Sequence, residues 1–257
     1  VHLKGLTSLQ TLELRSTKVS GAGLVHLKGL TNLRYLTLWN TQITDAGLVH
    51  LKVLTNLQEL SLADTKVTDA GLEYLKGLAN LEKLYLHGTN ITDAGLVHFK
   101  GLTNLQKLHL NLENTNITVS GLVHLKGLRL ASLSIPDAVK TDLGLKHYLA
   151  AVEPPTVLSL TDWQITDTGL GHLAGMNLKQ LSIPVQAQTD TGLKHYLEAV
   201  KPPTELSLFR WKITDAGLVH VKGLTSLQKL LLTGCPHITG AGLAHLRDMP
   251  SLTSLGL

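Results

Sequence analysis

Aromatic residues, cysteines and long hydrophobic runs are all scarce in this chain of 257 residues. Phe, Trp and Tyr make up only 4% of it although 43% is hydrophobic, so aliphatic side chains, chiefly leucine, must fill the core. The single cysteine, Cys235, excludes an intrachain disulfide. With no recognisable signal peptide in this segment, it favours a reducing, cytoplasmic compartment. No apolar run approaches the roughly 20 residues that a membrane-spanning helix needs.

Charge is also low. Charged residues are 16% of the chain and the formal net charge is +4. This excess of positive charge is too small to predict binding to nucleic acid, and the hydrophobic content excludes a disordered chain.

What the sequence does have is an internal repeat. The central leucine of the repeat recurs every 24 residues at Leu14, Leu38, Leu62, Leu86 and Leu110, and the same position continues at Ile135, Leu160, Ile183, Leu208, Leu232 and Leu257. This spacing predicts about eleven repeats. Each repeat begins with L-x-L, which is typical of a short half-buried strand, and continues with T-D-A-G-L, in which leucines have helical spacing. A unit this short cannot bury its apolar face alone, so we expect an α/β solenoid with a concave parallel sheet and convex helices.

The start of each expected helix carries Thr and Asp as candidate N-caps. The Asp residues are Asp45, Asp69, Asp93, Asp142, Asp167, Asp190 and Asp215. Two positions after the Asp lies a glycine, as at Gly47, Gly71, Gly95 and Gly217. We expect these glycines to allow the helix backbone to approach the strand layer closely.

The pattern L-x-x-L-x-L-x-x-T/C-x-I-T-D-x-G-L resembles the leucine-rich repeat, specifically its cysteine-containing subfamily. The closest match is the stretch from Leu230 to Thr239, which includes Cys235, and the resemblance extends over the whole chain. It implies a horseshoe that recognises proteins, as in substrate-adaptor subunits of ubiquitin ligases and in bacterial effectors. Elsewhere this chain has Thr where that subfamily has Cys, and we expect the hydroxyls to bond the loop backbone. These residues are Thr17, Thr41, Thr65, Thr89 and Thr115.

We expect residues 1–257 to form a single domain and, because both ends read as the middle of a repeat, a fragment of a longer protein. Its uncapped ends would then associate weakly end to end.

Part of the chain is duplicated, with one copy at about 133–173 and the other at about 181–221. In this block Trp163 and Trp211 replace the repeated Thr, and a core position is favoured over a ligand-stacking one. Proline pairs enter its strands at residues 154–155 and 202–203, where looser loops are expected.

The fifth repeat is two residues longer than its neighbours, between Leu110 and Thr115. This alignment places the insertion just after the strand. Such an insertion is either an accommodation bulge or a recognition loop.

Thirteen histidines suggest a metal site, but most form one column that recurs once per repeat on the helical side, at His26, His50, His98, His124, His147, His172, His195, His220 and His245. A metal site needs ligands that converge on one point, so we predict no metal. The sequence contains no phosphate loop, nucleophile elbow or paired cysteine motif. We therefore predict neither a cofactor nor an enzyme in this segment.

Outward-facing strand positions are the candidate binding site, because they have no role in the core. Aromatic and cationic residues, the composition of protein-binding hot spots, gather there in repeats two to five. The predicted partner-binding residues are Tyr35, Trp39, Lys83, Tyr85, His87, Lys107, His109 and Asn111. A smaller cluster surrounds Phe209 and Arg210.

The sequence thus predicts a non-catalytic scaffold that binds a protein partner on its concave face. Two alternatives stay open. One is the sensor or substrate-targeting portion of a larger enzyme, such as a ligase or kinase. The other is a structural spacer.

Overall fold

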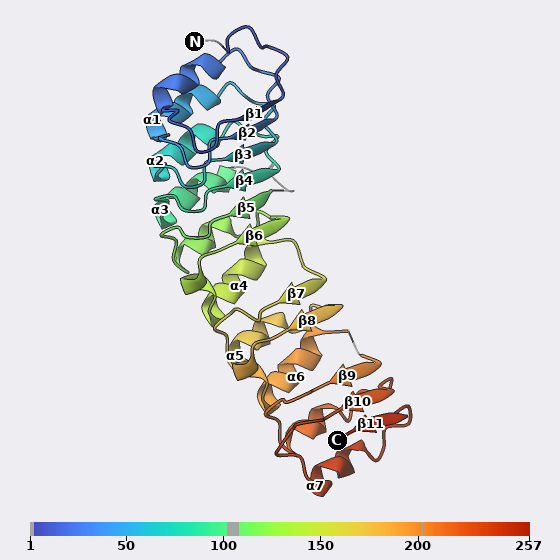
Figure 1. Cartoon of the computed structure of the whole chain (residues 1–257). Coiled ribbons are helices and arrows are strands. Elements are labelled where there is room, and N and C mark those ends of the chain that lie inside the picture. Colours follow the sequence, from blue (N-terminus) through green and yellow to red (C-terminus); the bar gives the residue numbers. More distant parts are fainter. Residues whose placement is uncertain (1–2, 102–107, 202) are drawn as a thin grey trace. The chain divides into compact units, whose positions relative to one another are not determined.

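The computed structural model describes residues 3–101, 108–201 and 203–257, in which short strands alternate with short helices (Figure 1). These residues group into two compact units. The first comprises residues 1–139 with 147–153, and the second comprises residues 140–146 with 154–257. Every paired strand is parallel to its neighbour. The leucine-rich-repeat solenoid predicted from the sequence is therefore confirmed.

The first unit contains a six-stranded sheet in which the strands follow chain order. The strands are β1 (Thr11–Glu13), β2 (Tyr35–Thr37), β3 (Glu59–Ser61), β4 (Lys83–Tyr85), β5 (His109–Asn111) and β6 (Ser132–Ser134). Chain order follows from the repeat, because each 24-residue turn returns the backbone to a position beside the previous strand.

In the second unit, two sheets are formed by the described residues, one of β7 with β8 and one of β9, β10 and β11. The strands are β7 (Val157–Ser159), β8 (Gln180–Ser182), β9 (Glu205–Ser207), β10 (Lys229–Leu231) and β11 (Ser254–Gly256). Among the described residues of this unit no pairing joins β8 to β9, and Pro203 lies two residues before β9. Proline lacks the N–H that a strand ladder requires.

Short helices connect the strands. The α-helices are α1 (Asp45–Leu48), α2 (Asp69–Leu72), α3 (Asp93–Leu96), α4 (Asp142–Ala151), α5 (Asp167–Leu170), α6 (Asp190–Ala199) and α7 (Gly240–Leu243). The 3₁₀ helices are Gly21–Leu27, Val49–Leu51, Glu73–Leu75, Val97–Gly101, Gly121–Leu125, Asp137–Val139, Gly171–Leu173, Val185–Ala187, Gly217–His220 and Ala244–Leu246. The duplication is visible in these elements, because α6 repeats α4 at an offset of 48 residues.

Stacked leucines form the core, as the low aromatic content predicts. Leu36, Leu60 and Leu84, at the centres of neighbouring strands, are at most 1% exposed. Phe99 is a buried ring that occupies a leucine position of the repeat. Trp163 and Trp211 are 8% and 7% exposed, which confirms their core position. Tyr196 of α6 packs edge-on against Trp211, with 5.6 Å between ring centroids.

The threonine column makes the backbone bonds expected of it. In each of five successive repeats the Thr hydroxyl donates to the carbonyl oxygen of the leucine three residues before it, over 2.5–2.7 Å. Thr41, Thr65 and Thr89 are buried, so their hydroxyls satisfy carbonyls that water does not reach. The substitution of Thr for Cys is thus compatible with the loop geometry.

The Asp column has a different role from the N-cap expected for it. The N-cap position is held by Thr, as Thr92 shows by accepting a hydrogen bond from the Ala94 N–H. Six of the seven Asp carboxylates reach the next repeat instead, where each accepts the backbone N–H of a Thr over 2.7–2.8 Å and its hydroxyl over 2.5–2.6 Å. Asp167 accepts the Thr189 hydroxyl over 2.7 Å through one oxygen, and its other oxygen has no partner within the described chain. The six pairs are Asp45–Thr68, Asp69–Thr92, Asp93–Thr118, Asp142–Thr166, Asp190–Thr214 and Asp215–Thr239. We call this arrangement the Asp–Thr ladder.

The ladder also corrects the expectation for the glycines. A Cβ atom on Gly71 would collide with Oδ1 of Asp45, and one on Gly95 would collide with Oδ1 of Asp69. The close approach is therefore to the carboxylate of the preceding repeat rather than to the strand layer. At Gly47 the close neighbour is the backbone of Gly21, which stands where later repeats have Asp.

Strand pairing shows that the predicted register of the fifth repeat is wrong. Leu110 pairs with Leu84, 26 positions before it, whereas Leu84 pairs with Leu60, 24 positions before it. The leucine equivalent to Leu86 is therefore Leu112, and the two additional residues precede β5 instead of following it. Residues 102–107, in the connection before β5, lie outside the described residues.

Candidate functional site

The outward face of the first unit's sheet presents side chains in three columns. Each strand contributes its first and third residues, and the second residue after the strand forms the third column. The first column contains Tyr35, Glu59 and Lys83, which lie on β2, β3 and β4. Neighbouring parallel strands are ~4.8 Å apart, so large side chains in adjacent repeats can contact one another.

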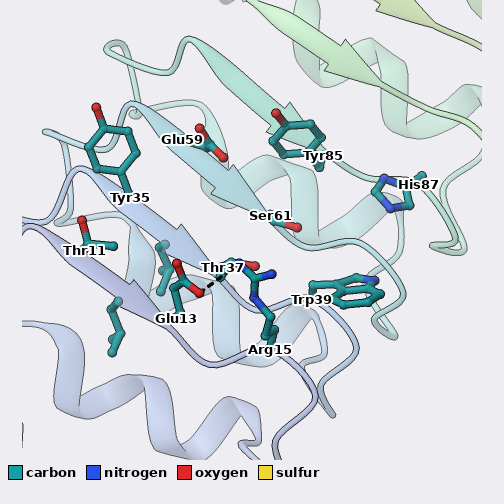
Figure 2. Close-up of a pocket in the computed structure, with 12 residues that line it drawn as sticks. Thr11, Glu13, Arg15, Tyr35, Thr37, Trp39, Glu59, Ser61, Tyr85 and His87 are labelled. Atoms are coloured by element: carbon teal, nitrogen blue, oxygen red, sulfur yellow. Dashed lines mark ion pairs between the residues drawn. The ribbon is translucent and has the colours of Figure 1, made fainter.

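A depression of about 360 Å³ lies on this face (Figure 2). We call it the aromatic depression. Its lining residues are Thr11, Leu12, Glu13, Arg15, Tyr35, Leu36, Thr37, Trp39, Glu59, Ser61, Tyr85 and His87. Four predicted site residues, Tyr35, Trp39, Tyr85 and His87, are thus brought together.

Trp39 is held in place by its indole N–H, which donates to the Asp64 carboxylate over 2.6 Å. Asp64 lies in the turn after β3 with a left-handed backbone (φ 51°), and its own N–H bonds the carbonyl oxygen of His87. Although its N–H is bound, the Trp39 side chain remains 39% exposed. The ring is therefore fixed by the adjacent repeat while still facing solvent.

Tyr85 and His87 form a second edge of the depression. Their rings meet edge to face, with centroids 6.5 Å apart and an interplanar angle of 85°. The residues alternate along the chain from β4, so both project from the same side of the sheet. Tyr35, on β2, is 43% exposed.

Two ion pairs border these rings. Arg15 lies 2.9 Å from Glu13, and Lys83 lies 3.3 Å from Glu59. The hydrogen bond that the Lys83 ammonium donates to Glu59, helped by the negative charge of that carboxylate, raises the pKa of Lys83. Both pairs are substantially exposed, so each adds little to the stability of the fold.

Three of the four remaining predicted residues, Lys83, His109 and Asn111, border a smaller depression of about 180 Å³. Its lining residues are Lys83, Tyr85, His109, Leu110, Asn111, Ser132 and Ser134. The corrected register moves His109 beside Lys83 and Asn111 beside Tyr85. Nδ1 of His109 bonds the Ser132 hydroxyl at 2.8 Å. Tyr85 borders both depressions, which are therefore neighbours on one face. Lys107 lies outside the described residues.

The prediction omitted three charged residues of the aromatic depression, Glu13, Arg15 and Glu59. Their outward position follows from the same alternation that identified Tyr35 and Tyr85. Because an isolated charge on a strand face is typical of any solvated surface, only the adjacency of the strands marks these charges as part of a site.

The smaller cluster of the second unit is also exposed. The Arg210 guanidinium lies 5.0 Å from the Phe209 ring centroid, and Lys229 lies 3.8 Å from Glu205. Within the described residues, no group of three or more His, Cys, Asp or Glu side chains is arranged to hold a metal. In the same part of the chain, no helix has the length and apolar character to span a membrane.

Comparison with known families and structures agrees with this architecture. The family model described as "Leucine rich repeat" matches residues 55–117, and "Leucine Rich repeats (2 copies)" matches residues 31–77. None of the curated proteins compared with the chain matches it.

Three solved structures illustrate the resemblance. Internalin C2 of Listeria monocytogenes is 33% identical over 52% of this chain and 54% of its own, with a TM-score of 0.42. An internalin (inlF) of the same organism is 20% identical over 100% of this chain and 89% of its own, also with a TM-score of 0.42. TLR13, solved as a complex with ssRNA13, is 22% identical over 98% of this chain and 39% of its own, with a TM-score of 0.54.

The chain therefore spans about half the length of internalin C2 and less than half of TLR13. At 22% identity the likeness to TLR13 concerns the fold alone. The repeat ladders, the chain-ordered parallel strands and both family-model matches lead to one conclusion: the chain has the fold of a leucine-rich-repeat solenoid, and its residues 31–117 match that family.

Proposed function

We propose that the chain is a non-catalytic scaffold that binds a peptide or an extended loop of a partner protein on the outward face of β1 to β5. The observation that carries this proposal is the aromatic depression. Its rings stand on a sheet that is held together by hydrogen bonds in every repeat, so they are positioned before a partner arrives. Binding to a preorganised surface costs less conformational entropy than binding to a mobile one.

The composition of the depression supports recognition of protein rather than mere solvation. Trp and Tyr are enriched in the residues that dominate protein–protein binding energy. Tyr35 and Trp39 are 43% and 39% exposed, although a core built from leucine has no need of rings at the surface. The small residues Thr37 and Ser61 lie between the larger side chains and leave room for a side chain of the partner.

The test is selection of peptides from a random display library on the immobilised chain, followed by affinity measurement. The double variant Trp39→Ala with Tyr85→Ala should weaken binding of selected peptides at least tenfold, since hot-spot truncations cost about 2 kcal/mol or more each. The matched control is Phe209→Ala with Tyr74→Ala, which removes two rings elsewhere on the chain. The circular dichroism spectrum of both variants should be unchanged.

Equal binding of peptides to the wild-type chain and the Trp39/Tyr85 variant would contradict the proposal. So would a selection that enriches no peptide. The latter result is what a structural spacer predicts.

A further inference from the structure

The aromatic depression combines a polar floor with walls that attract positive charge. Thr37 and Ser61 form the floor, and the Tyr35, Trp39 and Tyr85 rings stand around it. The face of an aromatic ring carries partial negative charge and attracts cations. Its volume of about 360 Å³ is at the small end of ligand sites, which suits one long side chain and its adjoining backbone.

The charged groups add to this attraction. Glu13 and Glu59 line the depression and are each paired with one cation, Arg15 and Lys83, respectively. These four charges balance, so the net negative charge comes from the neighbouring Asp64. This third carboxylate is hydrogen-bonded to Trp39. This bond draws the indole N–H toward a negative charge and so strengthens the attraction of the ring face for a cation.

The chain itself places a cation at this site. Figure 2 shows Arg15 extending toward Glu13, with its ion pair drawn as a dashed line, and with Trp39 on its other side. The side chains of Arg15 and Glu13 are 55% and 57% exposed, so water and a competing cation can reach the pair. Arg15 thus shows that the depression accommodates a cationic side chain. Because the pair is exposed to water, Glu13 holds Arg15 only weakly.

From this arrangement we propose that the depression receives a lysine or arginine side chain of the partner. The inference rests on the proposed function and specifies its ligand. The aliphatic part of the side chain would lie between the aromatic rings, and its charged end would bond the carboxylates of Glu59 and Glu13. At Glu59, Lys83 contacts Oε2, and we assign Oε1 to the incoming cation. At Glu13, the incoming cation displaces Arg15.

The test uses capped amino acids as probes, titrated into the isotopically labelled chain and followed by the NMR signal of the Trp39 indole N–H. N-acetyl-lysine methylamide and N-acetyl-arginine methylamide should shift this signal saturably. The norleucine analogue, which matches lysine in length without its charge, and the glutamate analogue should bind at least fivefold more weakly. Affinities in the millimolar range are expected for ligands this small.

Two substitutions should have opposite effects on lysine binding. Glu59→Gln removes an acceptor and should weaken binding about two- to fivefold, the usual size of an exposed charge interaction. Arg15→Ala removes the competing cation and should strengthen binding by a similar factor. The matched control is Glu205→Gln, because Glu205 and Lys229 form the corresponding pair on β9 and β10 of the second unit. This variant should leave the affinity unchanged.

Equal binding of the norleucine probe would overturn the inference, as would preference for the glutamate probe together with weaker binding in Arg15→Ala. Absence of saturable binding for every probe would overturn it too. The display experiment tests the proposed function separately from these titrations. If the selected peptides need Trp39 and Tyr85 for binding but contain no basic residues, the proposed scaffold function stands and the inference of a basic ligand is refuted.

Discussion

Asp215 joins its own repeat to the next one through Thr239. One carboxylate oxygen accepts the Thr239 backbone N–H over 2.8 Å, and the other accepts its hydroxyl over 2.6 Å. The same pairing recurs along both units, at Asp45 and Thr68 for example. Because nearest-neighbour interfaces determine the stability of a solenoid, bonds between repeats are where its cooperativity can be tested.

The Asp–Thr ladder predicts a loss of stability in acid. The hydroxyl of Thr239, followed by its backbone N–H, lowers the pKa of Asp215. A carboxyl whose folded-state pKa is below its unfolded value of about 3.9 stabilises the fold above that value, and this contribution is lost as the pH falls through the folded-state pKa. The urea midpoint of Asp215→Asn should therefore fall less than that of the wild type between about pH 7 and about pH 3.

Asp162→Asn is the matched control for this experiment, since it changes an exposed carboxyl outside the ladder. It should retain the pH dependence of the wild type. Identical pH dependence in wild type and Asp215→Asn would show that the ladder does not favour the ionised carboxylate.

The glycine next to the ladder should not tolerate a side chain. A Cβ on Gly95 would displace Oδ1 of Asp69, which bonds the Thr92 N–H at 2.7 Å. Overpacking costs about 1–3 kcal/mol, and the better helix propensity of alanine returns up to about 1 kcal/mol. Gly95→Ala should therefore lower the free energy of unfolding by about 1–2 kcal/mol in urea titration.

Gly77→Ala is the matched control, and it should change the free energy of unfolding by no more than about 0.5 kcal/mol. A Cβ there meets no atom of the described chain within 4 Å. If both variants are equally stable, the collision at Gly95 is relieved by movement of the Asp69 side chain and the predicted penalty does not exist.

The buried threonine hydroxyls should contribute more to the stability of the fold than the exposed one. Thr65 donates to the Leu62 carbonyl and is 5% exposed, whereas Thr17 makes the same bond to Leu14 in an exposed position. Removing a buried donor leaves the carbonyl without its partner at a cost of about 1–3 kcal/mol. Thr65→Val should show this loss in chemical denaturation, and Thr17→Val should show about 0.5 kcal/mol or less.

Thr65→Cys gives a further control, because a thiol is a weaker donor of similar size. Its stability should lie between those of the wild type and Thr65→Val. A valine variant as stable as the wild type would mean that the hydroxyl contributes only packing volume.

End-to-end association remains a prediction, and the structure suggests where it would occur. Within the described chain β11 pairs with β10 alone, and Leu255 and Leu257 near its edge are 42% and 68% exposed. Open strand edges with apolar side chains promote pairing between molecules. Light scattering of this 257-residue chain should show a mass that rises with concentration, and Leu255→Lys should reduce the rise. A constant monomer mass for the wild type would refute it.

Much of the fold was predictable because the repeat specifies it locally. Leucine alternation located the strands, and the recurring Thr located a hydroxyl that bonds a carbonyl only three residues away. The aromatic members of the site were equally accessible, since Tyr35 and Tyr85 occupy strand positions that alternate with buried leucines.

Tertiary structure decided what depends on contacts between repeats. In the fifth repeat, leucines at 108, 110 and 112 allow two registers that differ by two residues, and both keep leucine on the inner face. Strand pairing alone selects Leu110 opposite Leu84. For the same reason the sequence could identify Asp69 but not its partner Thr92, and could list Glu59 and Arg15 without showing that they share a depression with Trp39. Short-range periodicity therefore determined the elements, whereas the stacking of repeats determined which charges and rings face one another.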